Sequence, residues 1–96
     1  MNELKTIKAV LAQLKPELIE KFHVSSIGLF GSVVRDDFSS LSDIDIIVDF
    51  NRPIGIEFVD LADYLETKLE KRVDLVSKKG IRQKYYQQIK PEIVYV

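Results

Sequence analysis

The feature that most constrains this chain is a pair of apolar runs joined by a Gly-Ser turn and a polar spacer. The first run ends in Leu29-Phe30-Gly31-Ser32, and after ten residues the second begins with Asp43-Ile44-Asp45. Side chains of a strand alternate between its two faces, so Asp43 and Asp45 should share one face while the isoleucines enter a core on the other. The pattern predicts two buried strands and a carboxylate pair.

Two carboxylates on one face repel each other. At about 4 Å this repulsion is on the order of 4 kcal/mol with an effective dielectric constant near 20, and a divalent cation would relieve it. The chain has no cysteine and one histidine, and hard carboxylate oxygens suit Mg²⁺ or Mn²⁺ better than zinc or copper. Asp43 and Asp45 are therefore predicted metal ligands.

The Gly-Ser turn is a candidate phosphate-binding element. Gly31 permits close approach of the backbone to a ligand, and Ser32 is a predicted N-cap of a short helix. Backbone N–H groups at a helix start attract phosphate, and the serine hydroxyl adds a donor. Arg35, one turn later, can pair with a phosphate or carboxylate through its planar guanidinium group.

A third acid lies on a later apolar run, Arg72-Val73-Asp74-Leu75-Val76, which reads as a short strand. Asp74 should face away from the valine and leucine on either side of it. If this strand lies beside Asp43-Ile44-Asp45, the three carboxylates converge. Such acids can hold two metal ions that activate an attacking oxygen and neutralise a leaving pyrophosphate, which predicts phosphoryl or nucleotidyl transfer.

Amphipathic helices separate the predicted strands, which cover residues 25–30, 43–50 and 72–76. The first helix, with Asn2 as its cap, should be kinked or restarted by Pro16; its apolar stripe is Leu4, Ile7, Val10, Leu11, Leu14 and Leu18. The second helix connects strands two and three, which favours a parallel pairing; its stripe is Ile56, Val59, Leu61, Ala62, Leu65 and Leu69.

The end of the chain predicts a last helix after Gly80, which Pro91 stops. The apolar tail of residues 92–96 follows it as an extended segment. Two interpretations of the tail stay open at this point. It is either an edge strand or strap across the core, or a segment that binds a partner.

The spacing Gly31-Ser32, ten residues, Asp43-x-Asp45 and a later Asp74 resembles the signature of the DNA polymerase beta-like nucleotidyltransferase superfamily. It looks most like the minimal members, the MNT proteins, over residues 26–76, and Ser42 before Asp43 also fits. The resemblance implies an α/β (α+β) fold, in which helices pack against a small mixed sheet of three to four strands. It also implies that residues 1–96 form a single domain.

The resemblance further implies a reaction in which AMP from ATP passes to a hydroxyl group, that of a tyrosine above all, on a partner HEPN-domain toxin. The chain would be the antitoxin of this pair. The implied catalytic and Mg²⁺-binding residues, for two ions, are Asp43, Asp45 and Asp74, and the implied nucleotide-binding residues are Gly31, Ser32, Arg35 and Ser42.

Two alternatives remain at this stage. Family members often have glycine after the turn arginine, where this chain has Asp36, and a negative charge there would not favour triphosphate binding. The chain could then be a degenerate antitoxin that neutralises its partner by binding alone. Nucleotidyl transfer to RNA, as in larger relatives, is the other alternative.

Composition narrows the remaining classes. The chain has 96 residues, of which 46% are hydrophobic and 30% charged, and its net charge is −1. This length suits one core, and the charge predicts no tight autonomous binding of nucleic acid. No apolar run approaches the length of a membrane span and no signal peptide is evident, so a cytoplasmic protein is expected.

Overall fold

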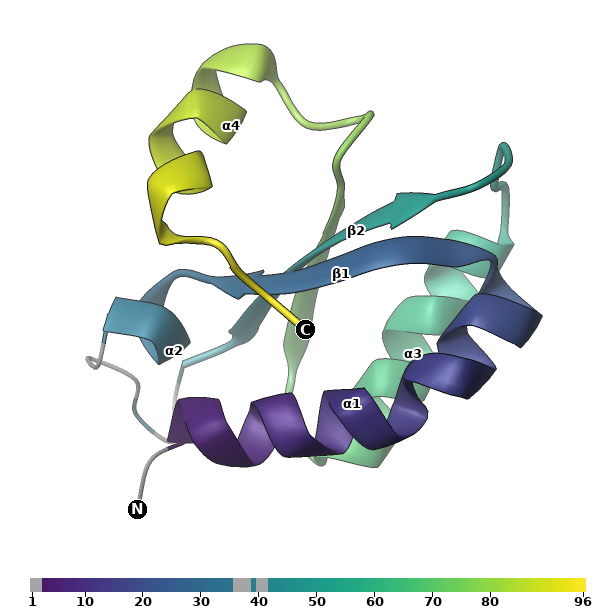
Figure 1. Cartoon of the computed structure of the whole chain (residues 1–96), viewed down its shortest axis with the longest axis horizontal. Coiled ribbons are helices and arrows are strands. Elements are labelled where there is room, and N and C mark those ends of the chain that lie inside the picture. Colours follow the sequence, from purple (N-terminus) through teal and green to yellow (C-terminus); the bar gives the residue numbers. More distant parts are fainter. Residues whose placement is uncertain (1–2, 36–38, 40–41) are drawn as a thin grey trace.

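The computed structural model describes residues 3–35, 39 and 42–96, and its centre is a four-stranded mixed sheet of order β3-β2-β1-β4 (Figure 1). Strand β1 is antiparallel to both β2 and β4, whereas β2 and β3 are parallel. The described elements are, in chain order, α1 (Glu3–Phe22), β1 (Val24–Phe30), α2 (Ser32–Arg35), β2 (Ile44–Phe50), α3 (Glu57–Leu69), β3 (Val73–Ser77), α4 (Gln83–Ile89), the 3₁₀ helix η1 (Lys90–Glu92) and β4 (Val94–Tyr95). The predicted mixed sheet of three to four strands is confirmed.

Helices cover both faces of this sheet, as Figure 1 shows. Helices α1 and α3 pack on one face and form the main core with alternate residues of the strands, among them Ile27, Leu29, Ile44, Ile46 and Val48. Helix α4 lies over the other face, where Ile89 is buried against Phe30 and Ile47. Alternation along β2 and β3 therefore places Asp45 and Asp74 on the α4 face.

The apolar tail forms an edge strand, as one of its two interpretations predicted. Val94 pairs with Leu29, and the Val96 N–H donates to the Ile27 carbonyl at 2.9 Å. Lys15 of α1 donates from Nζ to the Val96 carbonyl at 2.8 Å. The tail is thus hydrogen-bonded to β1 and tied to the first helix.

One detail of the helices differs from the predictions, and another agrees with one of two predicted outcomes. Ile56 and Val59 are not part of the buried stripe of α3, since they are 74% and 57% exposed. At about 100° per residue, Val59 lies roughly opposite the fully buried Leu61, so both cannot face the core. Helix α1 continues through Pro16 without a restart, and its ribbon changes direction in its second half (Figure 1), which fits the kink that was one of the two predicted outcomes.

The strand boundaries differ by about one residue from those that the sequence predicted. Strand β2 begins at Ile44, so Asp43 stands immediately before it, and β3 extends to Ser77. The predicted cap Asn2 and the residue after the turn arginine, Asp36, lie outside the described residues. Within the described ranges, no helix is both long enough and apolar enough to span a membrane.

Leu61 and Val59 offer a matched test of this packing. Leu61→Ala should lower the free energy of unfolding by about 2–5 kcal/mol, because it empties a fully buried position of the main core. Val59→Ala, on the exposed side of the same helix, should change it by no more than about 0.5 kcal/mol. Urea unfolding of both variants measures this, and equal losses would contradict the assigned faces of α3.

Candidate functional site

Asp45 and Asp74 lie directly opposite each other on the parallel strands β2 and β3. Asp45 is half-buried and Asp74 is exposed. Burial, the negative charges of Asp74 and Asp43, and a hydrogen bond with Asp74 raise the pKa of Asp45 from 3.8 to about 6, although Arg35 opposes the rise. The fold therefore holds two carboxylates together against their mutual repulsion.

Asp43, at the edge of the site, adds a third negative charge near this pair. Its side chain is exposed, and its Oδ1 lies 3.9 Å from Nε of Arg72. Its negative charge is one of the causes that raise the pKa of Asp45. Of the three carboxylates that were predicted to converge, those of Asp45 and Asp74 thus lie opposite each other, whereas that of Asp43 pairs with Arg72.

The donor chemistry suits a hard divalent cation. A cation between Asp45 and Asp74 would relieve the repulsion that raises the pKa of Asp45, and carboxylate oxygens are the ligands that Mg²⁺ prefers. Across residues 3–35, 39 and 42–96, however, no group of three or more His, Cys, Asp or Glu side chains is arranged to hold a metal ion. The site therefore offers a carboxylate pair with a third acid close by.

The turn at Gly31 brings the end of β1 against this pair. Gly31 has a φ of +78°, and a Cβ added to it would collide with Oδ2 of Asp45. Only glycine therefore allows the Asp45 carboxylate to lie against the turn. The resulting contact unites the two halves of the motif, which are ten residues apart in the sequence.

Ser32 is not the N-cap that the sequence predicted. The Gly31 carbonyl accepts hydrogen bonds from the N–H groups of Val34 and Arg35 at 3.0 and 3.1 Å, so the helical bonding starts one residue earlier. Ser32 is instead the first residue of α2. It still stands at the turn beside Gly31, within the predicted nucleotide-binding segment.

Glu92 is a site residue that sequence reasoning missed. Its Oε1 accepts a hydrogen bond from the Gly31 N–H at 2.9 Å and lies 3.4 Å from the Arg35 guanidinium group. The Gly31 N–H and the Arg35 guanidinium group, which were predicted to bind phosphate, thus contact the Glu92 carboxylate of η1. Because 61 residues separate Gly31 from Glu92, no local pattern could have revealed the contact.

A cavity of about 280 Å³ opens beside the turn, between it and α4. It joins the Gly31 turn and the Asp45 carboxylate to side chains of the last helix. The residues that line it are Phe30, Gly31, Arg35, Asp45, Tyr85, Gln88, Ile89 and Glu92. Four of the eight come from the C-terminal segment α4–η1, none of which the sequence marked as functional.

Ser42, another predicted nucleotide-binding residue, forms local contacts. Its Oγ accepts a hydrogen bond from the Ser39 N–H at 3.2 Å, and its own N–H donates to the Ser39 carbonyl at 3.0 Å. Ser42 is thus held in the loop directly before Asp43. It does not line the cavity of about 280 Å³.

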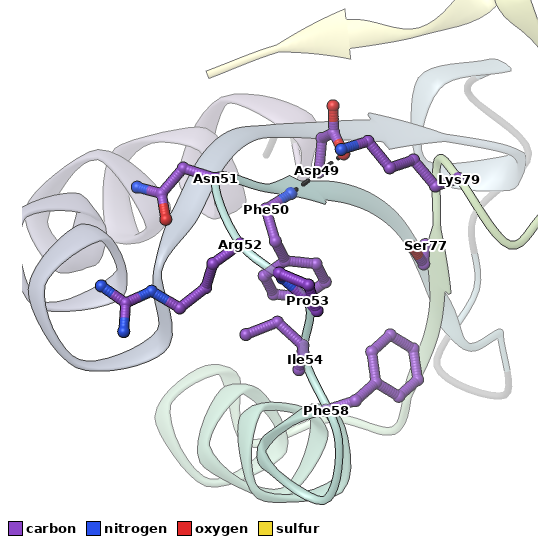
Figure 2. Close-up of a pocket in the computed structure, with 9 residues that line it drawn as sticks. All are labelled: Asp49, Phe50, Asn51, Arg52, Pro53, Ile54, Phe58, Ser77 and Lys79. Carbon is purple, nitrogen blue, oxygen red and sulfur yellow. Dashed lines mark hydrogen bonds between the residues drawn. The ribbon is translucent and has the colours of Figure 1, made fainter.

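A larger cavity, of about 630 Å³, lies at the opposite end of β2 from Asp45. Figure 2 shows its apolar side chains, Phe50, Pro53, Ile54 and Phe58, gathered at the centre, with Arg52 and Lys79 at the rim. None of the acids of the motif lines it. The cavity that contains Asp45 is therefore the smaller of these two.

The role of Gly31 is testable with a second glycine as control. Gly31→Ala should destabilise the chain by more than about 1 kcal/mol, since it adds a Cβ both at positive φ and against Asp45. Gly55→Ala meets no atom within 4 Å and should be neutral or slightly stabilising. Thermal unfolding compares the two variants; a Gly31→Ala chain as stable as Gly55→Ala would refute the close contact.

The raised pKa of Asp45 predicts a pH dependence of stability. Folded Asp45 binds a proton more readily than unfolded Asp45, so the free energy of unfolding should fall as the pH rises from about 3.8 to about 6. Asp74→Asn removes a neighbouring charge and should lower the pKa of Asp45. Carboxyl ¹³C NMR across this range measures both chains, and a wild-type Asp45 that titrates near 3.8 would contradict the geometry.

Comparison with known proteins identifies the family of this chain. Residues 11–96 match the nucleotidyltransferase domain family. The protein adenylyltransferase MntA of Thermococcus cleftensis is 42% identical over 97 residues, which cover all of this chain and 98% of that protein.

Solved structures give the same result. A minimal nucleotidyltransferase superposes with a TM-score of 0.81 at 28% identity, over 98% of this chain and 95% of that one. A chain from the complex of tri-AMPylated Shewanella oneidensis HEPN toxin with MNT antitoxin superposes with a TM-score of 0.71 at 26% identity, over 96% of this chain and 70% of that one. The chain therefore belongs to the nucleotidyltransferase family, among its minimal members related to the protein adenylyltransferases.

Proposed function

We propose that this chain transfers AMP from ATP to a hydroxyl group of a HEPN-domain partner and so acts as the antitoxin of that partner. The observation that carries the proposal is the Asp45–Asp74 pair held against the Gly31 turn. Two further findings support it. The MntA relative matches along almost its whole length, and the S. oneidensis complex contains a HEPN toxin that carries AMP.

In this proposal the triphosphate lies along the Gly31 turn. The Gly31 N–H, the Ser32 hydroxyl and the Arg35 guanidinium group would hold its phosphates, and Ser42 would contact the nucleotide from the loop before Asp43. Glu92 now accepts from the Gly31 N–H and pairs with Arg35, so its carboxylate must yield these donors when phosphate arrives. The triphosphate would therefore replace the Glu92 carboxylate as the anion held at the turn.

Asp45 and Asp74, with Asp43 as a third ligand, would hold Mg²⁺, two ions in the full site. Bound Mg²⁺ would neutralise the triphosphate and the charge that develops on the leaving pyrophosphate. To bind Mg²⁺, Asp43 would have to leave Arg72. Their contact is exposed and 3.9 Å long, so it costs little to break.

The partner's hydroxyl oxygen, that of a tyrosine above all, would attack the α-phosphorus of ATP. A new P–O bond forms, the bond from the α-phosphorus to the bridging oxygen breaks, and pyrophosphate leaves with the electron pair. The exposed Asp74 carboxylate would help to remove the hydroxyl proton. We place this reaction in the cytoplasm, where ATP is available.

The test combines this chain, a HEPN-domain partner protein, Mg²⁺ and ATP labelled in its α-phosphate. Wild type should label the partner, and Asp45→Asn or Asp74→Asn should slow labelling by about 10²–10⁴-fold while the complex still forms. Asp49→Asn is the matched control, since Asp49 also lies on β2 but at its far end, where it bonds the Phe50 N–H. It should label normally.

Three other outcomes would overturn the proposal. Toxin neutralisation by wild type and Asp45→Asn alike, without any label on the partner, would identify an antitoxin that acts by binding alone. Label on RNA instead of the partner would assign a different acceptor. Unimpaired labelling by both aspartate variants would remove the carboxylate pair from the mechanism.

A further inference from the structure

Tyr85 shares a cavity with the carboxylate pair. All four tyrosines of the chain, at positions 64, 85, 86 and 95, lie in its described part, and only Tyr85 lines the cavity that also contains Asp45, Gly31 and Arg35. It belongs to α4 and is 43% exposed. The proposed acceptor of AMP is a tyrosine, so a tyrosine of this chain beside the reacting groups is significant.

The position of Tyr85 is fixed from two directions. Its ring meets Phe30 edge-on, with 6.4 Å between ring centroids and an interplanar angle of 77°. Phe30 is in turn the residue directly opposite Asp45 on the antiparallel strands β1 and β2. Helix α4 itself is anchored by the buried Ile89. Phe30 therefore contacts the Tyr85 ring and is also the cross-strand neighbour of Asp45.

The electrostatic field at the phenol supports this placement. Burial and the negative charges of Asp45, Asp74 and Glu92 raise the pKa of Tyr85, whereas Arg35 opposes the rise. These four charged groups are all residues of the candidate site.

The other tyrosines are directed elsewhere. The Tyr64 hydroxyl donates to Oε2 of Glu17 at 2.6 Å, on the opposite face of the sheet. Lys78 Nζ lies 5.8 Å from the centre of the Tyr86 ring, and Tyr95 is on the edge strand β4. Tyr86 therefore provides an adjacent tyrosine on the same helix as a control.

We propose that Tyr85 is an internal acceptor, so that the chain transfers AMP to itself when no partner hydroxyl occupies the site. This rests on the proposed adenylyltransferase function and adds a modification site to it. The Tyr85 oxygen attacks the α-phosphorus of ATP, the α–β phosphoanhydride bond breaks, and pyrophosphate takes the bonding electrons. The phenol proton passes to a site carboxylate, which leaves an AMP-tyrosine phosphodiester.

The experiment uses the full chain alone with ATP and Mg²⁺, followed by intact mass measurement and peptide mapping. Wild type should gain the mass of one AMP group, located on Tyr85. Tyr85→Phe keeps the ring that packs on Phe30 but lacks the nucleophile, so it should lose at least nine-tenths of the label. Tyr86→Phe should be labelled like wild type, and Asp45→Asn should not be labelled.

A parallel reaction with the HEPN-domain partner separates this inference from the function on which it rests. Label on the partner without any on the chain alone would overturn self-transfer and leave the proposed function standing. Label on the chain at another residue, or full labelling of Tyr85→Phe, would also overturn it. Absence of label on both proteins would overturn both proposals.

Discussion

The structure depends on the contact between the Asp45 carboxylate and the turn at Gly31. A charged, half-buried side chain lies where any residue other than glycine would place its Cβ. The strand that carries Asp45 is held by burial on its other face, where Ile44, Ile46 and Val48 are fully buried. A slip of one residue would bring Asp45 into that core, so the hydrophobic register fixes the position of the carboxylate.

The C-terminal segment completes the site from a distance. Helix α4 contributes Tyr85 and Gln88 to the cavity, and η1 brings Glu92 to the Gly31 N–H. Directly after η1, β4 pairs with β1, the same strand that ends at Gly31. The C-terminal segment therefore both covers a sheet edge and, through its pairing with β1, helps to hold Glu92 at the turn.

The sequence could predict what depends on alternation and on neighbours along the chain. Strand parity predicted that Asp45 and Asp74 face away from the main core, and the intervening helix predicted their parallel strands. It could not predict Glu92 or Tyr85, because these approach the site only through tertiary packing. Even local reasoning failed where backbone geometry decides, as with Ser32, since the Gly31 carbonyl accepts the first bonds of α2.

The charges around the turn bear directly on the metal and nucleotide binding that we propose for this site. Among the described residues placed at the site, four carboxylates, those of Asp43, Asp45, Asp74 and Glu92, face two guanidinium groups, those of Arg35 and Arg72. A triphosphate would add further negative charge beside a carboxylate whose pKa is already raised to about 6. Divalent cations bound at the pair would offset this repulsion, and the triphosphate would compete with Glu92 for the Arg35 guanidinium group. In the proposed function, metal binding and nucleotide binding would therefore be coupled, because these carboxylates repel a triphosphate unless a cation neutralises them.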